Sequence, residues 1–154
     1  MNDLTFLNIR ETDCDSLHKF QKKYSKLLNN NIWNKNDLLE LIKKKKIYGK
    51  ICFRRHLIIG FCIAFKNINF LEIYSIFVRP SFRRLGVAEK IIKDCIKFCK
   101  ENSIQKIVLE VSEQNHEAKN LYFQNKFEIC GERKGYYTQD KIISNALLLE
   151  LLVN

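Results

Sequence analysis

The sequence has few of the residues that interrupt a fold. Its 154 residues include only five glycines and one proline, and no stretch rich in these residues divides the chain. No internal repeat is found either. Domain boundaries usually fall in such stretches, and the length fits one domain, so we expect residues 1–154 to form a single domain.

Long apolar runs are also absent. No run approaches the roughly 20 residues that a helix needs to cross a bilayer, which excludes a membrane-spanning protein of that kind. The opening residues "MNDLTFLNIRETD" lack the basic-then-apolar order of a secretory signal. We therefore expect a cytoplasmic protein that does not interact with membranes.

The cysteines and histidines do not form a metal-binding pattern. There are six cysteines but no C-x-x-C pair, and only three histidines, so the usual zinc spacing is missing. Cys95 and Cys99 are four residues apart on an apolar helical stripe, where a free thiol behaves as a small core residue. We expect free thiols in a reducing compartment and no metal.

The formal net charge is +10, which favours polyanions such as nucleic acid, ribosomes or a phosphorylated ligand. The alternative is compositional, because lysine is frequent throughout and "KKKK" (43–46) fits the solvated end of a helix. A basic, non-catalytic RNA-binding module is therefore one hypothesis. The basic residues are scattered and no RNA-reading aromatic motif is present, so we expect no direct nucleic-acid binding.

Hydrophobic periodicity predicts an α/β fold with a mixed (α+β) sheet. Strands are expected at 4–10, 47–55, 57–66, 70–79, 104–111, 127–133 and 144–153, and helices at 14–28, 37–45, 86–101 and 115–125. Thr12 or Asp13 is the predicted cap of the first helix and Asn36 that of the second. Residues 144–153 could also be helical, because leucine is not a strong strand former.

The connections predict the sheet topology. Short links at 55–56 and 67–69 indicate hairpins, hence an antiparallel meander. A helical crossover after the strand 70–79 returns the chain in the same direction, so this strand should have a parallel partner.

"VRPSFRRLGVAEKII" (78–92) places small residues between a strand and a helix. Gly86 and Ala88 would let a ligand approach the unpaired amides of the first helical turn, a natural anion site. Arg83 and Arg84 add charge that can fork onto phosphate oxygens. The spacing R-x-x-G-x-A fits a pyrophosphate, although a glycine at this position also suits a simple tight turn.

This stretch resembles the acetyl-coenzyme A signature of the GCN5-related N-acetyltransferases, Q/R-x-x-G-x-G/A. The expected element order, β-α-α-β-β-β-α-β-α-β-β with splayed central parallel strands, also resembles that family's fold. The resemblance implies acetyl-CoA as co-substrate. It implies that the backbone of the strand holds the pantetheine arm, at Ile76, Phe77 and Val78. It also implies that the turn holds the diphosphate, with Asn115 helping to hold the cofactor. The residues of the turn are Arg83, Arg84, Leu85, Gly86, Val87, Ala88 and Glu89.

"LEVSEQNHEAKNLYFQNKFEICGERKGYY" (109–137) is similar to the bacterial ribosomal-protein-alanine N-acetyltransferases (RimI type). "IWNKNDL" (32–38) and "ALLLELL" (146–152) resemble other segments of that subfamily. One departure is Lys126 where the subfamily has glycine. A left-handed residue there would cost a non-glycine side chain about 1 kcal/mol, unless Asn125 takes that conformation instead.

Acetyl transfer needs a base for the amine and a proton donor for the thiolate. Glu110 lies mid-strand, facing away from Leu109 and Val111, and is the candidate base; the alternative is a solvated strand glutamate. Glu72 is a second candidate base. The Tyr122 hydroxyl is the candidate acid, on a ring that can also be a core aromatic. No cysteine suggests a nucleophile, so direct attack in a ternary complex is expected.

Tyr136 and Tyr137, from a loop before the last strand, and Trp33 are the candidate residues that bind the substrate. Packing is the alternative role for each. The resemblance implies that the acceptor is a protein N-terminus, in particular the N-terminal alanine of ribosomal protein S18. A small amine, another protein's N-terminus or a lysine is the alternative acceptor.

Overall fold

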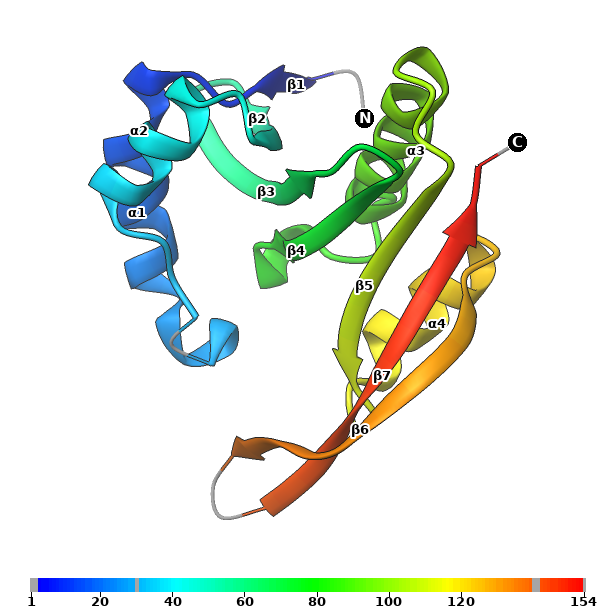
Figure 1. The fold of residues 1–154 in the computed structure, drawn as a ribbon. Coiled ribbons are helices and arrows are strands. Elements are labelled where there is room, and N and C mark those ends of the chain that lie inside the picture. Colours follow the sequence, from blue (N-terminus) through cyan, green and yellow to red (C-terminus); the bar gives the residue numbers. More distant parts are fainter. Residues whose placement is uncertain (1–2, 30, 140–141, 154) are drawn as a thin grey trace.

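The computed structural model describes residues 3–29, 31–139 and 142–153. Its elements follow the predicted β-α-α-β-β-β-α-β-α-β-β order (Figure 1). The strands are β1 Leu4–Asn8, β2 Ile47–Arg54, β3 Leu57–Lys66, β4 Phe70–Val78, β5 Lys106–Ser112, β6 Glu128–Gln139 and β7 Ile142–Leu152. The helices are α1 Cys14–Lys23, α2 Lys35–Lys43, α3 Val87–Glu101 and α4 His116–Gln124. The predicted mixed α/β fold is confirmed.

The described strands form one sheet in the order β1-β2-β3-β4-β5-β7-β6. Neighbouring strands are antiparallel except for β4 and β5, which are the predicted parallel pair. These two pair only from Phe70–Ile73 to Lys106–Leu109, and beyond this point they separate. The sheet is therefore open between the second half of β4 and the end of β5.

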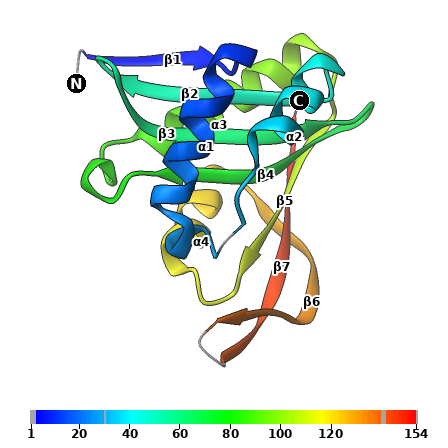
Figure 2. The ribbon, with the colours of Figure 1, turned by 90° about the vertical axis from the view of Figure 1, so that its left-hand side faces the viewer.

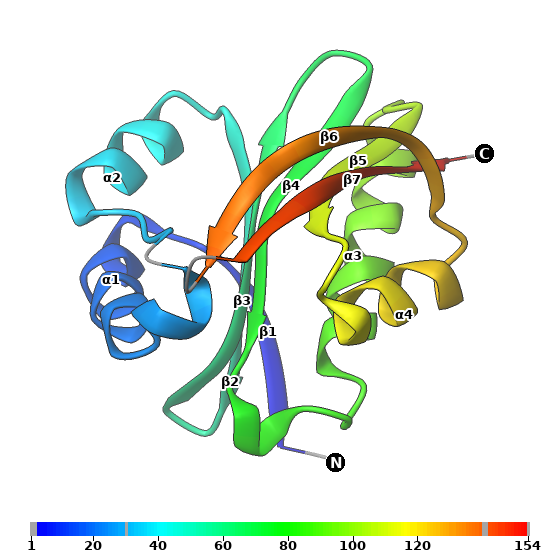
Figure 3. The same cartoon turned by 90° about the horizontal axis from the view of Figure 1, so that it is seen from below.

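Helices cover both faces of the sheet. Figures 2 and 3 show α1 and α2 on one face and α3 and α4 on the other. Side chains alternate across β3, so Phe61 and Ile63 join the core under α1 and α2, while Cys62 and Ala64 join the core under α3 and α4. This double cover explains why most of β3 is apolar and buried.

Two helix boundaries differ from those predicted. The first helix ends at Lys23, and a 3₁₀ turn Ser25–Leu28 follows it. The second begins at Lys35, capped by Asn34, whose Oδ1 accepts the Asp37 N–H at 2.9 Å. The predicted Asn36 cap is wrong because Asn34, two residues earlier, offers the same side-chain acceptor.

Asp13 precedes α1, but its carboxylate binds the Arg10 backbone and guanidinium instead of capping the helix.

The C-terminal hairpin agrees with the prediction in one respect and departs from it in another. Residues 142–152 form the predicted last strand and not the alternative helix, because β5 and β6 provide backbone partners on both sides. Strand β6 extends to Gln139 through two bulges, so Tyr136 and Tyr137 lie on a strand and not on a loop.

After α4, Lys126 adopts a left-handed backbone conformation (φ 69°), whereas Asn125 does not.

All six cysteines lie within the described residues, and none is in a disulfide. Five are buried and only Cys130 is exposed, as expected for thiols that act as core residues. Among the described helices, none is long and apolar enough to cross a membrane.

Candidate active site

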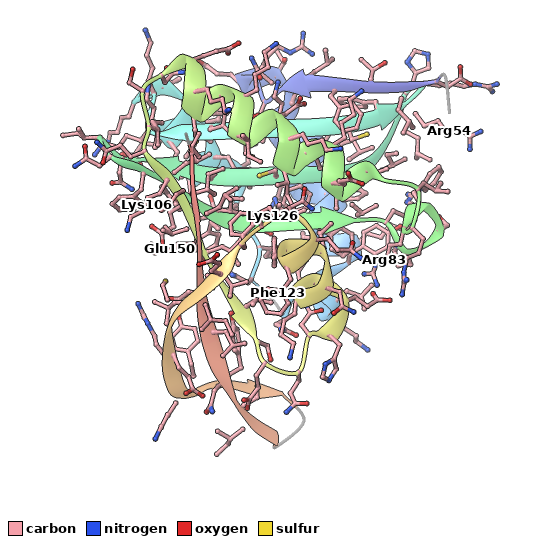
Figure 4. All side chains as sticks on the ribbon, turned by 90° about the vertical axis from the view of Figure 1, so that its right-hand side faces the viewer. Arg54, Arg83, Lys106, Phe123, Lys126 and Glu150 are labelled. Atoms are coloured by element: carbon pink, nitrogen blue, oxygen red, sulfur yellow. The ribbon has the colours of Figure 1, made fainter. Side chains whose placement is uncertain are left out.

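A tight turn connects β4 to α3 at the position labelled by Arg83 in Figure 4. After a 3₁₀ turn at Pro80–Phe82, Arg84 (φ 61°) and Gly86 (φ 74°) adopt left-handed conformations. Glycine does so without steric cost. A β-carbon added at Gly86 would meet no atom within 4 Å, so the space beside it is open to a ligand. The glycine is needed for its backbone angle, not to avoid a clash.

The backbone amides of this turn have no acceptor among the residues that the structure describes. The first hydrogen bond of α3 runs from the Lys90 N–H to the Gly86 carbonyl at 3.0 Å. Within the described part of the chain, no hydrogen bond is donated by the backbone of residues 84–89. Unpaired N–H groups at a helix start carry a partial positive charge and favour anions. The turn has the donors that a diphosphate requires.

The two arginines of the turn already have partners. The Arg83 Nε donates to the Val78 carbonyl at 3.2 Å, and its Nη1 lies 3.6 Å from Glu117 Oε2. The Arg84 Nη2 donates to Glu117 Oε1 at 3.2 Å. Arg83 thus closes the turn onto the strand, and Glu117, on the first turn of α4, contacts both guanidinium groups.

The end of β4 presents an open backbone edge towards β5. No described strand pairs with that edge beyond Ile73. Tyr74 is the extra residue of a bulge, because Ile73 and Ser75 oppose consecutive residues of β3. The side chains of Ile76 and Val78 pack into the core under α3 and α4, and that of Phe77 packs into the core under α1 and α2. This segment can therefore meet a ligand in the gap mainly through its main chain.

Glu110 lies on β5 just beyond the point where the strands separate. Its neighbours Leu109 and Val111 belong to the core under α3 and α4, so its carboxylate faces the opposite side of the sheet. The Glu110 Oε1 lies 2.9 Å from Arg133 Nη2 of β6. Glu72 lies within the paired part of β4, opposite Val108, and so on the same face as Glu110 but farther from the gap.

Tyr122 approaches the gap from the other face, on α4. Its ring is buried and packs edge-on against Phe127 at a centroid distance of 5.5 Å. Burial raises the pKa of the Tyr122 hydroxyl well above its usual value, because the phenolate would lose its solvation. The phenol therefore remains a proton donor at neutral pH.

Tyr137 belongs to the same region as both of these residues. Burial raises the pKa of Tyr137, and the negative charge of Glu110 raises it further. The ring of Tyr137 packs edge-on against that of Tyr136 at 5.1 Å, and the Tyr136 side chain is exposed. The tyrosine pair thus lies beside Glu110, on the hairpin that flanks the open end of the sheet.

Trp33 lies on the segment between α1 and α2. Its ring packs against Tyr74 at 5.1 Å and against Phe65 at 5.7 Å. Its carbonyl accepts a hydrogen bond from His18 Nδ1 at 2.8 Å. The Tyr74 hydroxyl in turn donates to Asn31 Oδ1 at 3.0 Å. These contacts hold Trp33 as a packing anchor that connects the α1–α2 segment to the bulge of β4.

Asn115 caps α4, with its Oδ1 accepting the Ala118 N–H at 3.1 Å. Its amide nitrogen has no hydrogen bond within the described residues. The cap orients this nitrogen at the start of the helix that also carries Glu117 and Tyr122.

A cavity of about 590 Å³ lies beside the turn, lined by the end of the β2–β3 hairpin and by Phe82. Arg54 and Arg83 lie at the same end of the molecule in Figure 4. The hairpin side is basic, with Arg54 stacked over Phe82 at 5.7 Å. Several basic side chains therefore lie near the turn.

Sequence reasoning did not find three residues of this region: Glu117, Arg133 and Tyr74. Glu117 is 33 residues from Arg84, and Arg133 reaches Glu110 from a different strand. Tyr74 enters the region because of the bulge in β4. None of the three stands in a local pattern that indicates its contacts.

The fold and the turn define a class of mixed-sheet proteins that can hold an extended phosphorylated ligand between two separating strands. Residues 8–127 match the model of the acetyltransferase (GNAT) family, which covers most of the chain. The chain belongs to this family and is an N-acetyltransferase.

One relative comes from Bacillus subtilis (strain 168), named "Putative [ribosomal protein bS18]-alanine N-acetyltransferase". It is 25% identical over 123 residues, which is 79% of this chain and 80% of the relative.

Two solved structures support the fold. The ribosomal-protein-S18-alanine N-acetyltransferase from Escherichia coli matches with a TM-score of 0.85 at 16% identity, over 98% of this chain and 94% of that chain. NAA60 of Arabidopsis thaliana in complex with acetyl-CoA matches with a TM-score of 0.82 at 16% identity, over 98% of this chain and 99% of that chain.

Proposed function

We propose that this N-acetyltransferase moves the acetyl group of acetyl-CoA to the α-amine of a protein N-terminus. The observation that carries the proposal is the open edge of β4, which leads directly to the unpaired amides of residues 84–89. An extended ligand with a diphosphate matches that arrangement. A fold neighbour in complex with acetyl-CoA supports this choice of co-substrate.

Acetyl-CoA would lie along β4 with its diphosphate on the turn. The main chain of Ile76–Val78 would pair with the amide groups of the pantetheine arm, as a missing strand would. The amides of residues 84–89 would bind the diphosphate, with Arg83 and Arg84 adding charge-assisted hydrogen bonds. The Asn115 amide nitrogen could donate to the same ligand, because its Oδ1 is already used by the helix cap.

The gap between β4 and β5 would bring the acid and the base together. Glu110 faces one side of the sheet and Tyr122 the other, so only a thioester within the gap could be reached by both. Tyr136 and Tyr137 would border the acceptor on the side of Glu110, and Trp33 would support the opposite wall through Tyr74.

The reaction needs one proton removed and one supplied. The thioester provides the activated acetyl group, and the acceptor amine forms the new C–N bond as the C–S bond breaks. Glu110 would take the amine proton through water, and Tyr122 would give its proton to the departing thiolate. An α-amine with a pKa of ~7.7–8.0 is roughly one-tenth neutral at pH 7, so part of the acceptor is already deprotonated before the base acts.

Glu110 is favoured over Glu72 as the base because it lies where the strands have separated. Glu72 sits where β4 and β5 are hydrogen-bonded, opposite Val108, which leaves no room for a thioester beside it. Glu72 lies on the same face of the sheet as Glu110, and its partner Val108 is two residues before Glu110 on β5. Glu72 is therefore the natural comparison in mutagenesis.

The acceptor we propose is the N-terminal alanine of ribosomal protein S18. The Bacillus subtilis relative carries this activity in its name, as does the Escherichia coli fold neighbour. A ribosomal acceptor would place the enzyme in the cytoplasm.

Mass spectrometry after incubation with acetyl-CoA tests the proposal. The acceptors are a peptide with the S18 N-terminus, the same peptide already N-acetylated but carrying an internal lysine, and spermidine as a small amine. We expect a single acetyl group on the α-amine of the first peptide only. Acetylation of spermidine or of the lysine at a higher rate would refute the acceptor, and no turnover with any amine would refute the activity.

A further inference from the structure

Glu117 binds both arginines of the turn. Its two carboxylate oxygens divide between them, with Oε1 3.2 Å from Arg84 Nη2 and Oε2 3.6 Å from Arg83 Nη1. These are the same guanidinium groups that the proposed function assigns to the diphosphate. We infer that Glu117 is an internal competitor of the diphosphate, which occupies the arginines until acetyl-CoA displaces it. This inference rests on the proposed function.

The two arginines are held differently. Arg83 is tied to the strand through the Val78 carbonyl, and its side chain is 40% exposed. Arg84 has Glu117 as its only side-chain partner within the described residues, and its side chain is 84% exposed. Arg84 can therefore change partner at little cost, because a solvated guanidinium needs no rearrangement of the core.

The Glu117 side chain can also release the two arginines easily. Its side chain is 59% exposed, and it lies in the first turn of α4, where the helix dipole favours its charge without the arginines. Exposed ion pairs of this kind are weak and screened by salt. A diphosphate brings more charge and more acceptor oxygens than one carboxylate, and the free amides of residues 84–89 bind it in addition.

The consequence is an enzyme whose affinity for the phosphorylated co-substrate is kept below its maximum. Binding must break the contacts of Glu117 and bring two like charges close together. The pantetheine portion would be unaffected, because it is uncharged and does not compete with Glu117 for the two guanidinium groups. Product CoA carries the same diphosphate, so its release would be favoured by the same carboxylate.

Calorimetric titration of the full chain with acetyl-CoA at low salt tests this inference. We expect Glu117→Gln to bind acetyl-CoA about 2–10-fold more tightly than the wild type, the value of two exposed ion pairs. Glu101→Gln is the matched control for net charge. Glu101 lies at the far end of α3, 3.7 Å from Lys97, and this variant should bind acetyl-CoA like the wild type.

Two further measurements separate competition from a structural effect. S-acetylpantetheine lacks the diphosphate, so its KM as acetyl donor should be equal in the wild type and in Glu117→Gln. The gain with acetyl-CoA should also shrink as salt is raised. In an Arg84→Gln background, Glu117→Gln should yield a smaller gain, because one of the two contested groups is gone.

Weaker binding of acetyl-CoA by Glu117→Gln would overturn the inference and make Glu117 a residue that orients the arginines for the ligand. Unchanged binding would overturn it as well. If Glu117→Gln does not fold, as judged by its thermal transition, Glu117→Ala and the Arg84→Gln comparison decide the matter. A wild type that binds no acetyl-CoA would instead refute the proposed function itself.

Discussion

Arg133 and Glu110 form an ion pair in which the guanidinium Nη2 lies 2.9 Å from the carboxylate Oε1. The residues belong to β6 and β5, and β7 lies between these strands in the sheet. The same guanidinium stacks over the ring of Tyr136, at 5.4 Å from its centroid. The C-terminal hairpin therefore fixes the direction of the carboxylate that we propose as the base.

Arg133→Gln should lower kcat for peptide acetylation by about tenfold, because a carboxylate that is free to turn away is no longer aligned with the amine. Arg133→Lys should retain most of the rate, since it keeps a cation beside Glu110. The KM for acetyl-CoA should stay constant in both variants, because the hairpin lies away from the turn. If Arg133→Lys lost as much kcat as Arg133→Gln, or if the KM for acetyl-CoA rose in either variant, a positioning role for Arg133 would be contradicted.

Glu110→Gln should slow transfer by about 10²-fold or more, because glutamine cannot accept the amine proton. Glu72→Gln is the matched change on the same face of the sheet, in the paired part of β4, and it should have a much smaller effect. Steady-state kcat with the S18 peptide measures both. The reverse ranking would make Glu72 the base.

Tyr122→Phe should also reduce kcat by about 10²-fold, because the thiolate loses its proton donor. The buried phenol has a pKa above its usual value of ~10, and the protonated form is the active one. Raising the pH from 7 towards 10 should therefore not remove the donor, and the wild-type rate should not fall through ionisation of Tyr122. A decline in wild-type kcat between pH 8 and 9 that is absent from Tyr122→Phe would mean that the hydroxyl ionises in this range and would contradict the raised pKa, whereas a wild-type rate in Tyr122→Phe would contradict the acid role.

The order of the elements could be predicted because most of them show a helical or alternating period of apolar residues. The phosphate turn was readable for a similar reason, since Gly86 and two arginines stand together between a strand and a helix. Boundaries were less accurate. The strand β6 was cut short at residue 133 because charged residues, Gly135 and two bulges obscure its alternation.

The contacts of Glu110 and of the turn arginines could not be predicted from the sequence. Arg133 meets Glu110 because the sheet places β7 between β5 and β6, an order that does not follow the sequence. Glu117 meets Arg84 because α4 starts beside the start of α3, a result of helix packing on one face. Local periodicity carries no information on either arrangement.

Lys126 offers a test of the fold that is independent of catalysis. It adopts φ 69° directly after α4, a conformation that costs a non-glycine residue about 1 kcal/mol. Lys126→Gly should therefore raise the free energy of unfolding by up to about 1 kcal/mol, measured by urea denaturation. Asn125→Gly is the control: its φ is −93°, and its side chain donates to the Leu121 carbonyl at 2.8 Å, so this change should destabilise. Equal effects of the two glycines would mean that backbone strain at Lys126 does not limit stability.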